Sequence, residues 1–537
     1  MPRSTKKEDR RPDLVGVDQI DLIRTTIHHR WGIIDWDVRF PWWRVPPKVR
    51  ILMYADSVVN FNGGSFLGLQ YVKTLLESRA YFYVDFDIAT AHRDGTDPSA
   101  SIAGAKKLTD LDILNKYDEI WFFGFNSAPN LSPAEVTLLD QFMAAPKFGG
   151  ILVTGDHADL GKGIAGPITR AGQMRRYPAP PNSPPSWNTT LEDGPDPGSS
   201  FDFNDQSDDR PQRIRYRRFS MWSPVVFKRR YRPHPVLCGP DGPIDVFPDH
   251  QHEGEALAPT PASGDPKWPT KSGHQETPYV IAWGKIKDPA ATKHGQEIGV
   301  ASAYDGHTVD VGRIVADSTW HHWFDINLTG TAASPSPYAG FDATPAGQAA
   351  LKKIDAYFLN CGVWLAPPDK QTAMRNAGWW SILWTDQIVE LPIDAPIWRL
   401  GEEAIDALGK RASRCTVSEW VFDFPLFKEK IPRWEWPQLF EKFQLFNLPF
   451  EQFVAGGILR QMMQQVGPGN AKLQFPRKAP PDELLGRAME AGIEEGLAAL
   501  TKQLRSETSL LLKIIDNGFR LEGPAPKKKP STTRKTR

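Results

Sequence analysis

The fold is decided by residues 131–157, which read LSPAEVTLLDQFMAAPKFGGILVTGDH. The first half carries the signals of a helix start, with Ser132 as the N-cap, Pro133 in the first turn and Glu135 three residues after the cap. Apolar residues then recur at helical spacing. This half therefore predicts a helix over residues 131–144.

The second half predicts a buried strand. Gly149 and Gly150 lead into the apolar run at residues 151–154, and a short apolar run bounded by glycine is typical of a strand covered on both faces. The run passes directly into Asp156 and His157, so polar side chains follow the carboxyl end of this strand. A helix followed by such a strand indicates a parallel βαβ unit.

Similar apolar runs recur from Lys48 onward, separated by longer amphipathic segments. Further strands are predicted at residues 49–54, 81–86, 119–124, 223–227, 244–247, 279–283, 298–303 and 313–316, and further helices at residues 66–77 and 346–360. The predicted fold class is therefore α/β, with a three-layer, flavodoxin-like parallel sheet, helices on both of its faces and a helical C-terminal region.

A chain of 537 residues is too long for one ordinary domain, and its composition changes along its length. The segment 482–515 has the apolar periodicity of a long amphipathic helix, which favours assembly of the chain into a homo-oligomer through its C-terminal helices. The predicted divisions are an N-terminal arm (1–46), an α/β domain (47–366) with a Pro-, Asn-, Asp- and Ser-rich insertion (178–212), a mostly helical domain (367–525) and a basic disordered tail (526–537).

The composition excludes several classes of protein. The chain has 64 Lys and Arg residues and 64 Asp and Glu residues. This balance argues against a folded domain that binds nucleic acid, because such binding needs an excess of positive charge to neutralise phosphates. Three cysteines without CxxC spacing exclude a disulfide framework. We expect a cytoplasmic protein that neither enters a membrane nor carries a secretory signal. The basic tail is interpreted as a solvated end, with contact to nucleic acid or an anionic membrane as the alternative.

Ligands of parallel sheets bind beyond the carboxyl ends of the strands, so polar residues that follow the predicted strands are candidates for a site. Asp56, Asn60 and Asn62 follow the first strand and Asn126 follows a later one. We predict that these four residues bind substrate. A loop that caps the next helix is the structural alternative.

Two further segments carry candidates for catalysis. Asp156 and His157 follow the strand at 151–154, and Asp317, His321 and His322 follow the strand at 313–316. The alternatives are an Asp that caps a helix and histidines that are buried at a strand end. All five residues are predicted to be catalytic.

A third segment, residues 248–255, concentrates side chains of the kind that bind metals. His250 and His252 project to one face of an extended chain, and Glu253 lies beside them, a set that suits a divalent zinc, iron or manganese ion. A solvated polar loop is the alternative. Whether a metal activates water, or a His acts as general base with an Asp that orients it, stays open.

The order of landmarks resembles the class I glutamine-amidotransferase-like superfamily, and is most similar to its trehalose-utilisation (ThuA-like) branch. The resemblance covers about residues 48–330. It rests on the strand Arg50 to Asp56, the segment Tyr117 to Trp121, the helix start Leu131 to Glu135, the strand Gly149 to Leu152, the pair His234-Pro235, and Gly312 to Val315 before His321.

The resemblance implies a nucleophilic Cys in a strand-to-helix elbow and a His after a late strand. Here the elbow position holds Asp156 and His157, and His321 or His322 is the late His. The Cys is absent, so hydrolysis of glutamine through a thioester is not expected. We expect a hydrolase-like enzyme of unknown substrate that takes a small molecule or a carbohydrate. The alternative is a non-catalytic binding or scaffold protein that assembles through its C-terminal helices.

Overall fold

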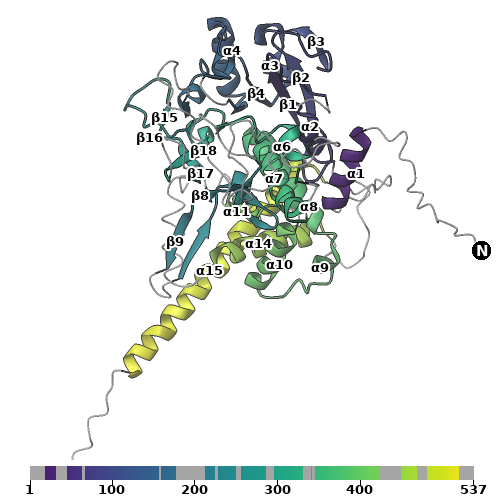
Figure 1. Cartoon of the computed structure of the whole chain (residues 1–537). Helices are drawn as coiled ribbons and strands as arrows, with labels where there is room; N and C mark the ends of the chain where they lie inside the picture. Colours follow the sequence, from purple (N-terminus) through teal and green to yellow (C-terminus); the bar gives the residue numbers. More distant parts are fainter. Residues whose placement is uncertain are drawn as a thin grey trace, which may run out of the picture.

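The centre of the computed structural model is a nine-stranded sheet in the order β3-β2-β1-β4-β5-β19-β18-β17-β8 (Figure 1). Its strands are β1 (Lys48–Ala55), β2 (Asp85–His92), β3 (Ile102–Ala105), β4 (Glu119–Phe123), β5 (Gly150–Val153), β8 (Arg215–Tyr216), β17 (Tyr279–Lys285), β18 (Glu297–Tyr304) and β19 (Ile314–Asp317). The structure describes residues 19–31, 45–62, 67–155, 159–176, 212–223, 228–248, 255–285, 295–330, 340–341, 345–410, 412–422, 449–467 and 480–518.

Six neighbouring strands of the sheet, from β3 to β19, are parallel. The last three, β18, β17 and β8, alternate in direction. The prediction of a parallel sheet is therefore correct for the first six strands and wrong for the last three. The reason is the length of the connections: too few residues separate β17 from β18, and β18 from β19, for a crossover, so these neighbours pair antiparallel.

Both faces of the parallel part are buried. Successive side chains of a strand point to opposite faces, and accordingly Ile51 and Met53 belong to one hydrophobic cluster while Leu52 and Tyr54 belong to another. Residues of α2 (Gln70–Glu77) and α7 (Pro345–Leu365) join the first cluster, and residues of α4 (Pro133–Met143) join the second. Near-continuous apolar strands such as β1 are the sequence signature of this double coverage.

The predicted start of α4 is confirmed. Ser132 accepts a hydrogen bond from the backbone N–H of Glu135, and the Glu135 side chain accepts one from the backbone N–H of Ser132, which makes a capping box with Pro133 in the first turn.

The strand predicted at residues 81–86 is wrong. The strand β2 begins at Asp85, and the aromatic residues before it serve packing instead. Tyr81 stacks on Tyr83 with ring centroids 5.3 Å apart, and Tyr83 meets Trp420 edge to face at 4.8 Å. Aromatic residues favour strands and buried loops alike, so the pattern placed the strand too early.

The C-terminal helices pack against the first hydrophobic cluster. They are α8 (Pro368–Ile382), α9 (Asp386–Val389), α10 (Ile397–Gly409), α11 (Arg414–Phe422), α14 (Phe450–Gln465) and α15 (Asp482–Gly518). The N-terminal half of α15 packs on α14, and its C-terminal half projects away from the rest of the chain (Figure 1). In the part of the chain that the structure describes, no helix is long and apolar enough to cross a membrane.

Candidate functional site

The direction in which the chain adds strands changes at β1. From β1 the chain adds β2 and β3 on one side, and it then returns to add β4 and β5 on the other. The loops that leave the carboxyl ends of β1 and β4 therefore run apart, and ligands of open α/β sheets bind at such a switch point. Asp56 follows the last residue of β1 directly, so this carboxylate lies where the loops diverge.

Asp56 is buried, with 1% of its surface exposed. Its Oδ1 accepts hydrogen bonds from the backbone N–H groups of Phe125 (2.6 Å) and Asn126 (3.1 Å), which follow β4. Its Oδ2 is also buried and has no hydrogen-bond partner among the described residues, so a water molecule has to reach it from the neighbouring cavity. Burial raises the pKa of Asp56 to about 6, although the two N–H groups act against this shift. The carboxyl group is therefore fixed through one oxygen and exchanges a proton near neutral pH.

An open cavity of about 750 Å³ lies between the loops that follow β1 and β2. Besides Val58, Val59 and Pro98, the described lining residues carry carboxylates, amides and hydroxyls and no Lys or Arg, so they offer hydrogen-bond donors and acceptors together with negative charge. The lining residues are Ser57, Val58, Val59, Asn60, Asn62, Asp94, Thr96, Asp97, Pro98 and Ser99. Such a lining suits a hydroxyl-rich or cationic molecule better than an anionic one.

Hydrogen bonds between the two loops fix the shape of this cavity. Asp94 accepts from the backbone N–H of Ser57 at 2.8 Å, and Thr96 donates to the Ser57 carbonyl. Asp97 accepts from the backbone N–H of Phe61 at 2.8 Å. Ser57 itself has a φ of 58°, a left-handed conformation that non-glycine residues adopt rarely and that these loop hydrogen bonds hold in place.

The structure brings together the four predicted substrate-binding residues. Asp56 and Asn126 are joined by the backbone hydrogen bond, and the Asn126 side chain also donates to Asp94 at 3.0 Å. Asn60 and Asn62 line the cavity. Their convergence follows from the parallel pairing of the strands that they follow.

The sequence interpretation missed Asp94, Thr96 and Asp97. These residues follow β2, and they went unnoticed because the strand was placed at residues 81–86 instead of Asp85–His92. The signal was present, since the alternation FDIATAH ends in a run rich in Asp, Gly and Thr. His92, the last residue of β2, is buried, and burial lowers the pKa of its imidazole.

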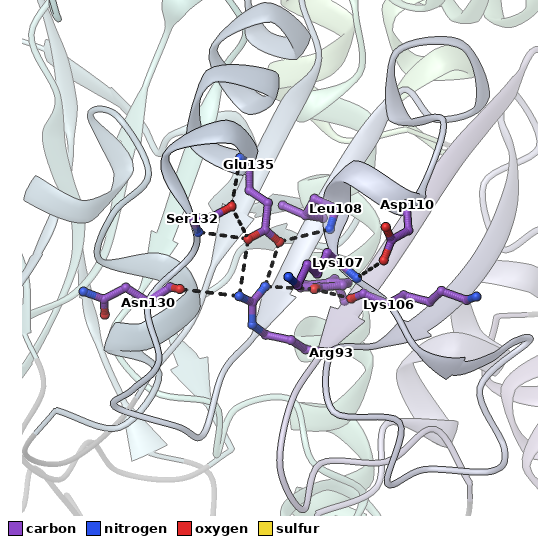
Figure 2. Close-up of polar contacts among 9 residues, drawn as sticks. Arg93, Lys106, Lys107, Leu108, Asp110, Asn130, Ser132 and Glu135 are labelled. Atoms are coloured by element: carbon purple, nitrogen blue, oxygen red, sulfur yellow. Dashed lines mark hydrogen bonds and ion pairs between the residues drawn. The ribbon is translucent and has the colours of Figure 1, made fainter.

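A buried ion pair holds the loop after β2 against α4 (Figure 2). The Arg93 guanidinium lies 2.8 Å from Glu135, which also accepts from the backbone N–H groups of Ser132 (2.9 Å) and Leu108 (3.1 Å). Burial alone would raise the pKa of Glu135, but these donors, Arg93 first, outweigh it and lower the pKa to about 2. The loop after β2, which forms one wall of the cavity, is thus anchored to α4 and to the second hydrophobic cluster.

Asp317 and His322 are also brought together, at the carboxyl end of β19. His322 Nδ1 lies 2.9 Å from Asp317 Oδ1, while Asp317 Oδ2 accepts from Trp323 Nε1 (3.1 Å) and from the Tyr357 hydroxyl (2.8 Å). An Asp that holds Nδ1 of a His fixes the orientation and tautomer of the ring. The predicted pairing of an imidazole with an Asp therefore exists at this strand end.

This pair is enclosed by aromatic rings. Asp317 and His321 are 0% exposed and His322 is 1% exposed. His322 packs on Phe247 at 4.6 Å, and His321 lies against Trp320 at 4.0 Å. The predicted residues are thus part of the core beneath the strand ends, as Asp56 is, whereas the cavity that begins at Ser57, the residue after Asp56, is open.

Arg175 links the ends of β5 and β19. Its guanidinium donates to the Ser318 carbonyl at 3.0 and 2.6 Å, and it lies so close to Gly155 that a Cβ there would sit 2.8 Å from Arg175 Cζ. A side chain at Gly155 would also sit 2.9 Å from the Leu160 carbonyl oxygen, so both this buried cation and the backbone would have to shift. The sequence interpretation did not single out Arg175, because nothing local distinguishes it from the neighbouring Arg176.

Five predicted site residues lie outside the described residues: Asp156, His157, His250, His252 and Glu253. Within the described ranges, no group of three His, Cys, Asp or Glu side chains is arranged to hold a metal ion. The three cysteines are buried, and none lies in the cavity lining.

Comparison with known proteins identifies no relative. No family model, no curated protein and no solved structure matches the chain.

Proposed function

We propose that this chain is a hydrolase-like enzyme whose site lies at the carboxyl ends of β1, β2 and β4, with Asp56 as the acid–base group. The observation that carries the proposal is the state of Asp56: a buried carboxylate at the switch point of the sheet, held through Oδ1, with a pKa of about 6. A general base works best when its pKa lies near the working pH.

In the proposed reaction, Asp56 Oδ2 takes a proton from water while the water oxygen attacks the substrate. The protonated carboxyl group then returns that proton to the leaving oxygen or nitrogen. The hydrogen bonds to Phe125 and Asn126 keep the carboxylate in place through both steps.

The proposed substrate is a small hydroxyl-rich molecule, such as a carbohydrate derivative. Asn60, Asn62 and Asp94 present amide and carboxylate groups to the cavity, and these groups pair well with hydroxyl groups. An anionic substrate would meet Asp94 and Asp97, and no cation among the described lining residues offsets them.

The Asp317–His322 pair is proposed to support the strand ends, since both oxygens of Asp317 already accept hydrogen bonds, from His322, Trp323 and Tyr357, whereas Oδ2 of Asp56 accepts none from the described residues. Catalytic roles for Asp156, His157 and His321, and metal binding by His250, His252 and Glu253, stay predictions. If a metal binds, it would supply an activated water molecule.

The proposal includes a flavodoxin-like, three-layer arrangement and a relationship to the amidotransferase-like proteins without their Cys. The strand order 3-2-1-4-5 and the two buried faces of the sheet support the layered arrangement. The parallel pairing of β5 with β19 supports the relationship to the amidotransferase-like proteins. It places β5, which leads to the elbow position at Asp156, beside β19, which leads to His321 and His322.

A panel of chromogenic glycosides, esters, amides and phosphate esters tests the function. We expect turnover of a hydroxyl-rich member, with a rate that rises through about pH 6 as Asp56 loses its proton. Asp56→Asn keeps the shape of the side chain and should lower kcat by about 100-fold or more. Asp87→Asn, at an exposed carboxylate on β2 far from the strand end, is the matched control and should leave kcat unchanged.

Full activity in Asp56→Asn would overturn the assignment of the base. A wild-type chain that turns over no member of the panel, yet is stabilised thermally by one, would favour the alternative, a non-catalytic binding protein.

A further inference from the structure

The C-terminal half of α15 stands apart from the folded body. Leu485, Met489 and Ile493 in its N-terminal half are buried, but from Thr501 onward every described side chain except Leu504 is exposed. Residues 501–518 extend about 27 Å at the helical rise of 1.5 Å per residue, and Figure 1 shows this part pointing away from the other helices. An isolated helix of this length is only marginally stable in water, so a partner is expected to cover it.

Three consecutive leucines lie on this projecting part. Leu510, Leu511 and Leu512 are 59%, 59% and 54% exposed. The other exposed large apolar side chains of the described residues, such as Val389 and Trp398, occur singly. A contiguous exposed apolar patch marks an interaction site, whereas scattered apolar residues do not.

The direction of these leucines distinguishes between partners. Successive residues of a helix lie 100° apart, so Leu510 to Leu512 cover about 200° of the circumference. One partner helix contacts a narrower stripe, and it would leave at least one of the three in water. The boundary between lipid headgroups and acyl chains receives an amphipathic helix over a wide sector and can cover all three.

Charge at this end of the chain complements an anionic surface. Lys502, Arg505 and Lys513 are exposed on the same part of α15, and so are Glu507 and Asp516, so three basic against two acidic residues leave this part of the helix with a formal charge of +1. Beyond Gly518 the sequence holds seven Lys or Arg residues and one acidic residue, Glu522, although the whole chain has a formal net charge of zero. The positive excess therefore lies in the sequence that follows the leucine-bearing part of the helix. Each basic residue near an anionic leaflet contributes about 1 kcal/mol of attraction.

We propose that the C-terminal half of α15 and the basic tail together form a docking element for an anionic phospholipid surface. The leucines insert below the headgroups while the basic side chains contact the lipid phosphates. Stable attachment at a membrane surface needs two such signals, one apolar and one electrostatic. This element attaches to a membrane surface and does not cross it.

Sedimentation of the full-length chain with vesicles tests the proposal. We expect binding to vesicles of phosphatidylcholine mixed with phosphatidylserine, little binding to phosphatidylcholine alone, and weaker binding as salt is added. L510S/L511S/L512S should weaken binding by about tenfold or more, and K527Q/K528Q/K529Q should weaken it by a similar factor. Val389→Ser removes an exposed apolar side chain elsewhere and should bind as wild type.

Because these leucines lie on the projecting half of α15, L510S/L511S/L512S is expected to keep the circular dichroism and melting temperature of the folded body. A wild-type chain that stays in the supernatant with both kinds of vesicle would overturn the proposal. So would wild-type binding by L510S/L511S/L512S. An oligomer that these serines dissociate, in a chain that ignores vesicles, would also overturn it, because the leucines would then be an interface between copies of the chain.

Discussion

At the scale of single residues, Asp56 couples the site to the stability of the fold. The pKa of Asp56 is about 6 in the folded chain, against about 4 for an Asp in an unfolded chain. Between these values the folded state holds more protons, so the free energy of unfolding falls as pH rises from about 4 to about 6 and then levels off. Asp56→Asn cannot ionise. We expect the variant to match wild type near pH 4 and to exceed it by about 2 kcal/mol near pH 7.

Urea unfolding across this pH range measures the difference. Asp87→Asn, at an exposed carboxylate, is the control and should follow the wild-type curve. Curves for Asp56→Asn and wild type that run parallel from about pH 4 to about pH 7 would contradict the raised pKa. Asp56→Asn should therefore be more stable than wild type near pH 7 and less active. This combination is expected where a buried charge is needed for function but destabilises the fold.

The sequence pattern predicts which residues follow the strand ends and so belong to a site. It does not predict how deeply their side chains are buried. Asp56 and Asn126 come together because parallel strands end at one edge, and this follows from the sequence pattern. Asp317 and His322 were predicted on the same grounds and do pair. Their enclosure depends on Phe247 and Tyr357, which are distant from them in sequence, so no local pattern reveals it.

At the scale of elements, glycines set how closely α14 and α15 pack. A Cβ at Gly492 would lie 2.4 Å from Ile458 Cα and 2.5 Å from the Gly457 carbonyl oxygen. Both are backbone atoms, so the helices would have to move apart. We expect Gly492→Ala to lower the free energy of unfolding by about 1–3 kcal/mol, as overpacking of a core does.

Gly486→Ala is the matched control in the same helix. A Cβ at Gly486 meets nothing within 4 Å, so alanine should raise stability by about 1 kcal/mol through its higher helix propensity. Chemical denaturation of the two variants measures both changes. Equal effects of the two substitutions would show that the close approach of α14 and α15 does not limit the side chain at Gly492.

Elements were predictable where local chemistry specifies them. The start of α4 is fixed by Ser132, Pro133 and Glu135, which satisfy backbone groups within one turn. The start of β2 is not fixed by local chemistry. Tyr81 and Tyr83 favour a strand by composition, but Tyr81 packs on Tyr83 and Tyr83 packs on Trp420 in a loop instead. That displacement also hid Asp94 and Asp97 as lining residues of the cavity.

At the scale of the whole molecule, the α/β class and the central parallel strands follow from the sequence, whereas the far edge of the sheet does not. The strands β17 and β18 carry the same apolar runs as β1 and β4. Their direction is decided by the length of their connections and by the neighbours that they find, which lie outside any single run.

The predicted boundary near residue 366 falls inside one continuous hydrophobic cluster. This cluster joins Met53 of β1 and Tyr357 of α7 to Trp380 of α8 and Ile458 of α14. A shared core couples the unfolding of both parts, so calorimetry of the full chain should show one transition with equal calorimetric and van't Hoff enthalpies.

A chain that ends at residue 366 tests the same coupling. It would uncover large side chains such as Tyr83, which packs on Trp420, and each is worth about 1.5–3 kcal/mol when buried. Losing several of them approaches the whole stability of a typical domain, about 5–15 kcal/mol. We therefore expect the shortened chain to lack a cooperative thermal transition. A shortened chain that melts cooperatively at the wild-type temperature would show that the α/β part folds alone and that the C-terminal helices are a separate domain.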